Sequence, residues 1–318
     1  MNKRMVAVVG FLLVVSLLAV AQILREDRVP PVRIGYLPIL ASLPLFVAQE
    51  NGYFNESGIT IETVPLQSSN QLVDALLRGD IDIAVESSAA PVFMVETVDP
   101  GRVKIFSASD ITVDAPFDSI VVRKESPIET LNGLEGRKVG VFPGTTATRL
   151  LKDFLVGKGI NTAAMEFIQI VPQNQLPALY TGSVDALHSY EPATAIALDG
   201  GQARRLYGSV YAEQLNHNPQ GVALISAAFI GKNPLRAQKV VAAFDYAFND
   251  IRKNDTEARR IAATAFGIGQ GAVGQVVFLY MSPSSTVNGE VLQAYADMLV
   301  SLGELQKKVD VSRLLYRP

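Results

Sequence analysis

The chain has 318 residues, of which 48% are hydrophobic and 19% are charged, so it is long enough for about two domains and too apolar for a disordered protein. Its net charge is −3 and it has no long basic run, which argues against a nucleic acid as partner. It contains no cysteine. This excludes disulfides, thiolate chemistry and a lipid anchor on a processed cysteine.

The N-terminus is typical of a segment that leads a chain out of the cytoplasm. A short basic stretch, Asn2–Arg4, precedes the apolar run Met5–Val20, and Ala19–Ala21 offers the small residues that a signal peptidase requires. The run is a little short for a membrane span, so an uncleaved anchor is the alternative to a cleaved signal peptide. Residues 1–21 are therefore predicted to be a signal peptide or anchor, residues 22–31 a linker, and the rest extracytoplasmic.

The first lobe is predicted from alternating strand-like and helix-like segments. Three β-branched runs, separated by helical spacing and by glycine and proline, indicate a βαβαβ unit with a parallel sheet. These runs are Val32–Pro38, Ile59–Pro65 and Ile81–Val85, and the third delivers Glu86, Ser87 and Ser88 at its carboxyl end. Ser42 is expected to cap a helix that Gly52 ends, and a fourth strand is expected at Val103–Ser107.

The same order of elements returns about a hundred residues later. Lys138–Gly144 repeats the first strand, with Gly140 falling on Gly35 at an offset of 105. Asp185 falls on Asp82 at an offset of 103, within a matching stretch of leucine, alanine and glycine. This order of elements predicts two similar α/β lobes in tandem.

The chain is predicted to cross between the lobes twice and to end in helices. Asp118–Glu125 is a strand-like first crossing, and the apolar run Gly221–Ile230 suits a buried return strand. Helices that pack on lobe one are expected from Asn233 to Ile251, at Asp255–Phe266, at Gln275–Tyr280 and at Gly289–Leu302. The fold class is therefore α/β, with lobe one at 32–117 and 221–318 and lobe two at 118–220, each a mostly parallel sheet flanked by helices.

Gly144, Thr145 and Thr146 are the best-placed candidate contacts to a ligand. They directly follow a strand and begin an amphipathic helix, so free backbone N–H groups and two hydroxyls would face an anionic or polar ligand. Open α/β sheets bind ligands at the carboxyl ends of their strands. Simple capping of the helix explains the same residues without a ligand.

Other functional patterns have little support. Gly269–Gly274 fits the dinucleotide fingerprint, but a helix precedes it and no βαβ unit surrounds it, which favours an inter-helix loop. His188 and Glu191 stand three residues apart, yet the scarcity of histidine and the lack of cysteine argue against a metal site. His188 is more typical of a polar cleft or packing residue.

Catalysis is not predicted, because neither G-x-S-x-G nor H-E-x-x-H occurs. Ser87 or Ser88 with His188 would need an orienting carboxylate to form a triad. The remaining possibility is that Glu86 and Glu191 pair as acid and base across a cleft.

Five segments in this order resemble the substrate-binding proteins of ABC importers for nitrate, sulfonates, taurine and thiamine-pyrimidine precursors. They are Gly35–Pro38 with Pro44–Phe54, Ala75–Val85, Ser119–Val141, Val184–Pro192 and the helix that begins at Pro234. The similarity covers roughly Val32 to Ser312. It implies a type II periplasmic-binding fold, in which two hinge strands join the lobes and the ligand lies between them.

The resemblance also implies ligand contacts and excludes one enzymatic branch. Carried over by position, the contacts are Leu37, Pro38, Leu40, Ser42, Glu86, Ser87, Ser88, Gly144, Thr145, Thr146, His188, Tyr190 and Glu191. No cofactor and no metal are implied. The related yeast-type pyrimidine synthase needs a cysteine cluster, which this chain lacks.

Two positions depart from the family pattern. The family often has tryptophan before the Glu-Pro pair, where this chain has Tyr190, and glycine or threonine where it has Glu86. A carboxylate at that position would repel a bare anion such as nitrate and could bind an amine or amidine, as on taurine or an aminopyrimidine. The alternative is that Glu86 points to solvent.

The sequence therefore predicts an extracytoplasmic, monomeric solute-binding protein of an ABC uptake system. It would capture a small organic solute of the sulfonate, taurine, nitrate or aminopyrimidine type and deliver it to a membrane permease. A membrane-tethered sensory module of the same fold is the alternative, and an enzyme of the pyrimidine-synthase type is a weaker one.

Overall fold

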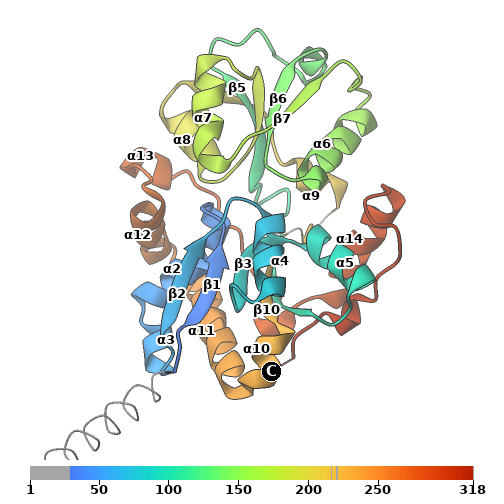
Figure 1. Cartoon of the computed structure of the whole chain (residues 1–318). Helices are drawn as coiled ribbons and strands as arrows, with labels where there is room; N and C mark the ends of the chain where they lie inside the picture. The colour runs from blue at the N-terminus through green and yellow to red at the C-terminus, as the bar shows by residue number, and fades with distance from the viewer. Residues whose placement is uncertain (1–28, 216, 220, 318) are drawn as a thin grey trace, which may run out of the picture.

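The computed structural model describes residues 29–215, 217–219 and 221–317, which form two lobes stacked one on the other (Figure 1). The predicted signal peptide or anchor and most of the linker lie outside the described residues. In the described part of the chain, no helix combines the length and the apolar character needed to cross a membrane.

Lobe one is built on a five-stranded sheet with the order β2-β1-β3-β10-β4. Its strands are β1 (Val32–Tyr36), β2 (Ile61–Pro65), β3 (Ile83–Ser88), β4 (Val103–Ala108) and β10 (Gly221–Ser226). Its helices are α2 (Leu43–Glu50), α3 (Tyr53–Glu56), α4 (Ser69–Arg78), α5 (Ala89–Val98), α10 (Ala227–Lys232), α11 (Pro234–Lys253), α12 (Asp255–Phe266) and α14 (Gly289–Ser301), with short 3-10 turns η1 (Leu40–Ser42), η3 (Ser284–Thr286) and η4 (Val311–Arg313). Only β10, which returns from lobe two, runs antiparallel to its neighbours in this sheet.

Lobe two repeats this plan with the strand order β7-β6-β8-β5-β9. Its strands are β5 (Asp118–Arg123), β6 (Lys138–Val141), β7 (Glu166–Gln169), β8 (Ala186–Tyr190) and β9 (Ala203–Tyr207). Its helices are α6 (Thr145–Gly157), α7 (Pro172–Thr181), α8 (Ala193–Asp199) and α9 (Val210–Gln214), with the 3-10 turn η2 (Leu131–Leu134). Here β5, which arrives from lobe one, is the antiparallel strand. The predicted two-lobed α/β fold is confirmed.

The internal repeat of the sequence corresponds to repeated local structure. Asp82 Oδ2 accepts a hydrogen bond from the backbone N–H of Arg33 at 2.9 Å, and Asp185 Oδ2 accepts one from that of Lys138 at 3.0 Å. Each aspartate therefore ties the start of its third strand to the start of the first. The helix that precedes each aspartate ends on a glycine in the left-handed region, where a side chain would be strained, at Gly79 (φ 76°) and Gly182 (φ 78°).

The two predicted crossing strands belong to separate sheets, as β5 and β10, and the connections that precede them lie side by side. The backbone groups of Ile111 and Asn218 exchange hydrogen bonds of 3.0 and 2.9 Å, which joins the outgoing segment to the returning one. Two paired segments of this kind can act as a hinge, because a few dihedral changes there reorient whole lobes.

The predicted helix at Gln275–Tyr280 is wrong. This run has a turn at Gln275 and no regular secondary structure at 276–280, and the next residue, Met281, forms an antiparallel bridge with Ser109 in the outgoing connection. Its valines and aromatic residues favour extended backbone, which the apolar pattern alone did not distinguish from a helix.

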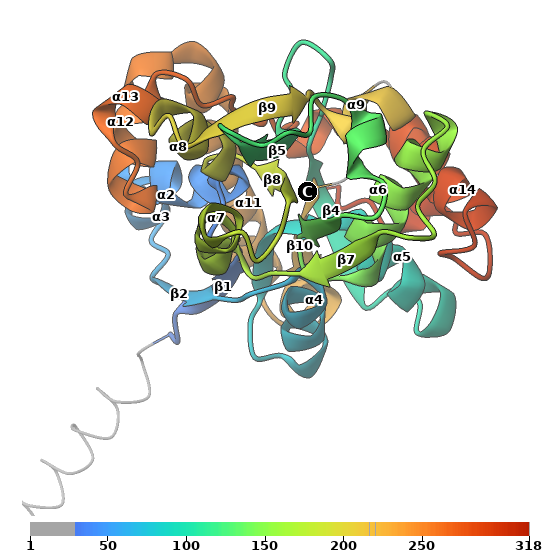
Figure 2. The same ribbon diagram turned by 90° about the horizontal axis from the view of Figure 1, so that it is seen from above.

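The fingerprint-like segment Gly269–Gly274 contains a short helix, α13 (Gln270–Val273), rather than only a loop. This helix leaves lobe one and packs against α8 of lobe two, as both views of the fold show (Figures 1 and 2). Gln275 Nε2 donates a hydrogen bond to Asp199 Oδ1 at 3.2 Å across this contact.

Two further local predictions need correction. The apolar run Gly221–Ile230 is a strand only as far as Ser226, whose hydroxyl accepts a hydrogen bond from Phe229 N–H and so begins α10. Ser42 does precede α2, but its hydroxyl makes no capping bond, because the 3-10 turn η1 already continues into the helix.

Candidate ligand-binding site

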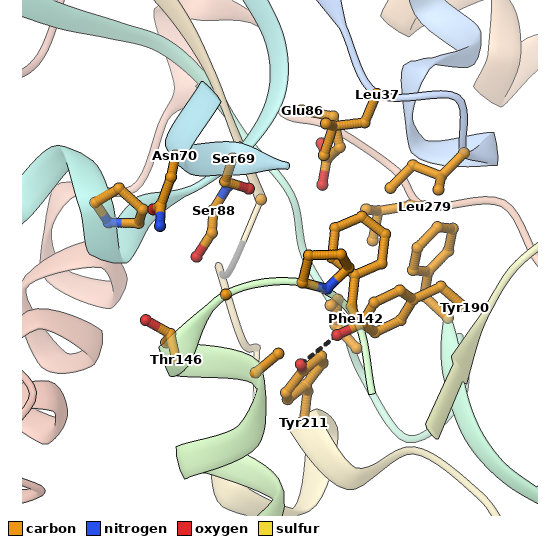
Figure 3. A pocket seen from close by; sticks show the side chains of 18 of the residues that line it. Leu37, Ser69, Asn70, Glu86, Ser88, Phe142, Thr146, Tyr190, Tyr211 and Leu279 are labelled. Carbon is orange, nitrogen blue, oxygen red and sulfur yellow. Dashed lines mark hydrogen bonds between the residues drawn. The ribbon is translucent and has the colours of Figure 1, made fainter. Parts of the chain in front are cut away.

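A cavity lies between the two lobes and takes its walls from both of them (Figure 3). Its lobe-one wall contains Leu37, Ile39, Ser69, Asn70, Glu86, Ser88, Pro91, Ile111, Gly221 and Leu279. Its lobe-two wall contains Phe117, Phe142, Pro143, Gly144, Thr145, Thr146, Ala147, Tyr190 and Tyr211. Most of these residues follow the carboxyl ends of β1, β2, β3, β6 and β8, where open α/β sheets place their ligands.

One side of the cavity is polar because three helices begin there. Ser69 and Asn70 lie in the first turn of α4, Ser88 precedes α5, and Thr145 and Thr146 open α6. The first turn of a helix has N–H groups without partners inside the helix and carries partial positive charge. This side of the cavity therefore offers hydrogen-bond donors to an anionic or polar group without a charged side chain.

The opposite side is aromatic. Tyr190 stacks on Phe117 at 6.3 Å between ring centroids, and Phe142 tilts against Tyr190 at 5.3 Å. The hydroxyl groups of Tyr190 and Tyr211 share a hydrogen bond of 2.5 Å, drawn as a dashed line in Figure 3. Burial raises the pKa of Tyr190 well above its ordinary value, so this wall is uncharged. It suits the apolar body of a small organic molecule.

Glu86 enters the cavity from lobe one through an irregularity in its sheet. Between the pairs Val222 with Ser87 and Leu224 with Ala84, β10 contributes one residue and β3 contributes two, which is a β-bulge. Glu86 is one of those two residues and has φ 60°, a left-handed conformation that is rare for a residue with a side chain. Bulges re-aim side chains, and here the carboxyl group points into the cavity (Figure 3).

The carboxyl group of Glu86 is buried without compensation. Glu86 is only 7% exposed, and its Oε2 has no hydrogen-bond partner among the described residues. Burial raises the pKa of Glu86 from its ordinary value to about 8. The sequence alternative that Glu86 points to solvent is therefore wrong.

Seven of the thirteen predicted contacts line the cavity: Leu37, Glu86, Ser88, Gly144, Thr145, Thr146 and Tyr190. The other six lie outside its walls: Pro38, Leu40, Ser42, Ser87, His188 and Glu191. Leu40 and Ser42 are buried in η1 beneath the loop after β1. Ser87 is buried in β3, where its hydroxyl donates to the carbonyl of Ser88 at 3.1 Å.

His188 lies one layer behind the aromatic wall. It is fully buried, and its Nε2 is 2.8 Å from Asp118 Oδ2. Its ring meets those of Tyr190 and Tyr211 edge to face, at 5.4 and 5.1 Å between centroids. Asp118 also accepts from the N–H of Val210, so His188 belongs to a buried polar cluster that supports the wall.

Glu191 is directed away from the cavity. Its Oε2 accepts a hydrogen bond from the N–H of Ala195 at 3.2 Å in the first turn of α8. Burial raises its pKa to about 7, although this hydrogen bond and the charge of Arg205 act in the opposite direction. The two carboxyl groups of Glu86 and Glu191 do not face each other, so the acid–base pair considered from sequence does not form. No group of three potential metal ligands occurs among the described residues.

The sequence reasoning missed several wall residues for different reasons. Ser69 and Asn70 follow a parallel strand and begin a helix, the same signal that identified Thr145, so they could have been found. Tyr211 and Leu279 carry no such signal, because the fold brings them to the cavity from α9 and from the extended segment after α13.

Comparison with known proteins gives one family and several relatives. The profile of the NMT1-like family matches residues 25–267. A putative aliphatic sulfonates-binding protein of Escherichia coli K12 is 27% identical over 96% of this chain and 94% of its own length.

Solved structures support the fold. The alkanesulfonate-binding protein SsuA of Xanthomonas axonopodis pv. citri, bound to MOPS, superposes with a TM-score of 0.75 at 21% identity, over 91% of this chain and 98% of its own. The desulfurization enzyme DSZB superposes with a TM-score of 0.63 at 20% identity, over 89% and 96%. The same fold therefore occurs in a binding protein and in an enzyme, so the cavity must decide between these roles.

Proposed function

The chain belongs to the NMT1-like family, and from this premise we propose that it is the solute-binding component of an ABC uptake system. It captures a small organic solute between its lobes and delivers it to a permease in the cytoplasmic membrane. The observation that carries this proposal is the cavity, whose two walls come from two lobes joined by paired crossings. The sulfonate-binding roles printed for the E. coli and Xanthomonas relatives support it.

Closure of the lobes gives the binding event its mechanism. A solute that touches both walls binds the closed state better than the open one and shifts the population toward it. A direct contact joins the lobes near the cavity, since the N–H of Leu40 donates to the carbonyl of Glu191 at 3.2 Å. Because a single chain supplies both walls, a monomer is sufficient.

An organic solute fits the cavity better than a bare inorganic anion. The aromatic wall would have no role in binding nitrate, whereas the carbon chain of a sulfonate or the ring of a heterocycle would pack against it. The donors on the polar side suit a sulfonate or another acceptor group.

Binding is favoured over turnover by the composition of the walls. The cavity residues among those described include serine hydroxyls and one carboxyl group but no histidine, so the walls contain no Ser–His pair. Incubating purified protein with each solute that binds, followed by mass analysis, should return the solute unchanged.

The N-terminal segment is proposed to place the protein outside the cytoplasm, as a cleaved signal peptide or as an anchor. Intact mass of the native product separates the two, because cleavage would leave a chain that begins at Gln22. A native product that is full length and cytoplasmic would contradict export.

A thermal-shift screen tests the proposed function. The panel contains sulfonates, nitrate, taurine, aminopyrimidines and aromatic acids, each added to the full chain. A solute present at 100 times its dissociation constant should add ~2.7 kcal/mol to the stability of the folded state. If no member shifts the melting temperature, solute capture of this class is wrong.

A co-purification with the permease encoded nearby separates transport from the sensory alternative. We expect the loaded protein to bind the permease more tightly than the empty one. Binding to a signalling protein and not to a permease would favour the sensory module.

A further inference from the structure

We propose that Glu86 selects the solute by binding a cationic nitrogen group, an amine or amidine, while the opposite end of the same solute lies against the first turns of α4, α5 and α6. This inference rests on the proposed function and specifies the class of solute. It is carried by the geometry around Glu86, by the charges that line the cavity and by the cost of keeping this carboxyl group where it is.

The backbone at Glu86 is maintained against its own preference. A residue with a side chain in the left-handed region is strained relative to relaxed backbone, and glycine would remove that strain. Such conformations cluster at ligand sites because the surrounding structure holds them in place. Glycine at position 86 would relieve the strain but would place no side chain in the cavity. The strained backbone therefore serves to hold a carboxyl group there.

The neighbouring strand leaves room for that carboxyl group. A Cβ atom built on Gly221 would lie 1.7 Å from Oε1 and 2.5 Å from the carboxyl carbon of Glu86. Any side chain at this position of β10 would therefore push the carboxyl group out of its place. Glycine at position 221 of β10 thus leaves the space that the carboxyl group of Glu86 on β3 occupies.

The described residues around Glu86 provide no cation to balance it. No lysine, arginine, histidine or second carboxylate lines the cavity, from β1, α4, α5, β10 or the lobe-two wall. The other titratable groups of the walls are the phenols of Tyr190 and Tyr211, which bond to each other. An ionised carboxylate in such a place is costly unless a partner arrives with opposite charge.

The remaining polar groups are all suited to the other end of the solute. Ser69, Ser88, Thr145 and Thr146 contribute hydroxyls, and the three helix N-termini contribute N–H groups. In the described walls Glu86 is the one side chain that can carry negative charge at neutral pH. A solute with an acceptor group at one end and a protonated nitrogen at the other matches this division, and its carbon skeleton meets the aromatic wall.

Binding of such a solute should move a proton. Burial raises the pKa of Glu86 to about 8, so at pH 7 the free protein holds this carboxyl group mostly protonated. A solute that is already an ammonium at pH 7 stabilises the ionised form, and the proton that leaves Glu86 passes to the buffer. For such a solute we expect release of close to one proton per molecule bound at pH 7. A mostly neutral aminopyrimidine would instead take the proton of Glu86 itself, with no net release.

The experiment is titration calorimetry of the full chain in buffers of different ionisation enthalpy, with matched solute pairs. The pairs are taurine with ethanesulfonate, and 4-amino-2-methylpyrimidine with 2-methylpyrimidine. In at least one pair the amine member should bind at least tenfold more tightly. If that member is taurine, whose amine is protonated at pH 7, binding should release a proton, whereas the aminopyrimidine should bind with little net release. Glu86→Gln should weaken that member at least tenfold and abolish the proton release. The amine-free member should change little.

Glu191→Gln is the control, because Glu191 is also buried at the end of a middle strand but does not line the cavity. It should leave both affinity and proton release unchanged. Equal binding of both members of a pair, tighter binding of the amine-free member, or taurine binding by wild type at pH 7 without proton release would overturn the role of Glu86 while leaving solute capture intact. Failure of every probe and of the wider panel to bind would instead contradict the proposed function and, with it, this inference.

Discussion

Glu86 and Glu191 occupy corresponding places in the two lobes and have opposite surroundings. Both lie at the carboxyl end of the middle strand of a five-stranded sheet, β3 in lobe one and β8 in lobe two. Glu86 faces the cavity without a partner among the described residues, whereas Glu191 accepts a hydrogen bond from the first turn of α8. The repeated order of elements therefore places both glutamates at the same end of equivalent strands, but it does not determine the direction in which each side chain points.

The register of the neighbouring antiparallel strand explains the difference. β5 pairs with β8 without interruption from Asp118 opposite Tyr190 to Val122 opposite Ala186. β10 pairs with β3 through a bulge, and Glu86 sits in it with a left-handed backbone. The extra residue in β3 thus turns the side chain of Glu86 toward the cavity, where it can contact a solute, whereas Glu191 only supports the fold.

The largest expected effect that separates the two glutamates is on stability as a function of pH. Each has its pKa raised by burial, Glu86 to about 8 and Glu191 to about 7. Between about pH 4.5 and these values the unfolded carboxyl group has lost its proton and the folded one has kept it. The unfolded state then binds fewer protons, so stability falls as pH rises, by roughly 3–5 kcal/mol for each group.

Denaturant unfolding of the solute-free protein from pH 5 to pH 9 measures this fall. In Glu86→Gln the decrease between pH 7 and pH 8 should disappear, while Glu191→Gln should keep it and lose part of the decrease below pH 7. If the stability of Glu86→Gln still fell between pH 7 and pH 8 as steeply as that of wild type, the carboxyl group of Glu86 would not be the buried acid that causes this fall.

A second comparison removes the hydrogen bond that makes Glu191 structural. Glu191→Ala leaves the N–H of Ala195 without its acceptor at the start of α8, which should cost ~1–2 kcal/mol of folding stability. Solute affinity should stay within twofold of wild type, because Glu191 does not line the cavity. Glu191→Gln keeps an acceptor oxygen and should cost less. Lost affinity at unchanged melting temperature would place Glu191 with Glu86 in the site.

The smallest effect concerns the lobe-two wall. Thr145→Ala combined with Thr146→Ala should weaken solute binding by ~0.5–1.5 kcal/mol for each hydroxyl hydrogen bond lost. Because Gly144 is the N-cap of α6 and neither hydroxyl makes a capping bond, the melting temperature should change little. Thr148→Ala, one turn further along the same helix and outside the cavity walls, is the matched control. Unchanged affinity in the double variant would leave these threonines no role in binding.

Much of the fold could be predicted because its signals are local and occur twice. The aspartates Asp82 and Asp185, the glycines Gly79 and Gly182 and the strand patterns around them each act over a few residues, and their repetition reinforces the assignment. The helix at Gln275–Tyr280 failed because an apolar run of that length fits either secondary structure, and its pairing with the crossing at Ser109 is set by distant residues.

The site could be predicted in part, for the same reason. The rule that ligands bind at the carboxyl ends of parallel strands located Thr146, and the family resemblance supplied Leu37 and Ser88. The direction of Glu86 depends on a bulge between strands more than 130 residues apart in the chain, since Glu86 pairs near Val222. No local pattern encodes that register, so sequence left open whether Glu86 faced solvent or cavity.

The most direct test of this account is a crystal structure of the full chain with the amine-bearing solute that binds most tightly. The account predicts electron density between the lobes, with the nitrogen group within hydrogen-bond distance of Glu86 and the acceptor end near the first turn of α6. A solute bound outside this cavity would contradict the proposed site. A solute within it whose nitrogen points away from Glu86 would contradict the assignment of that residue.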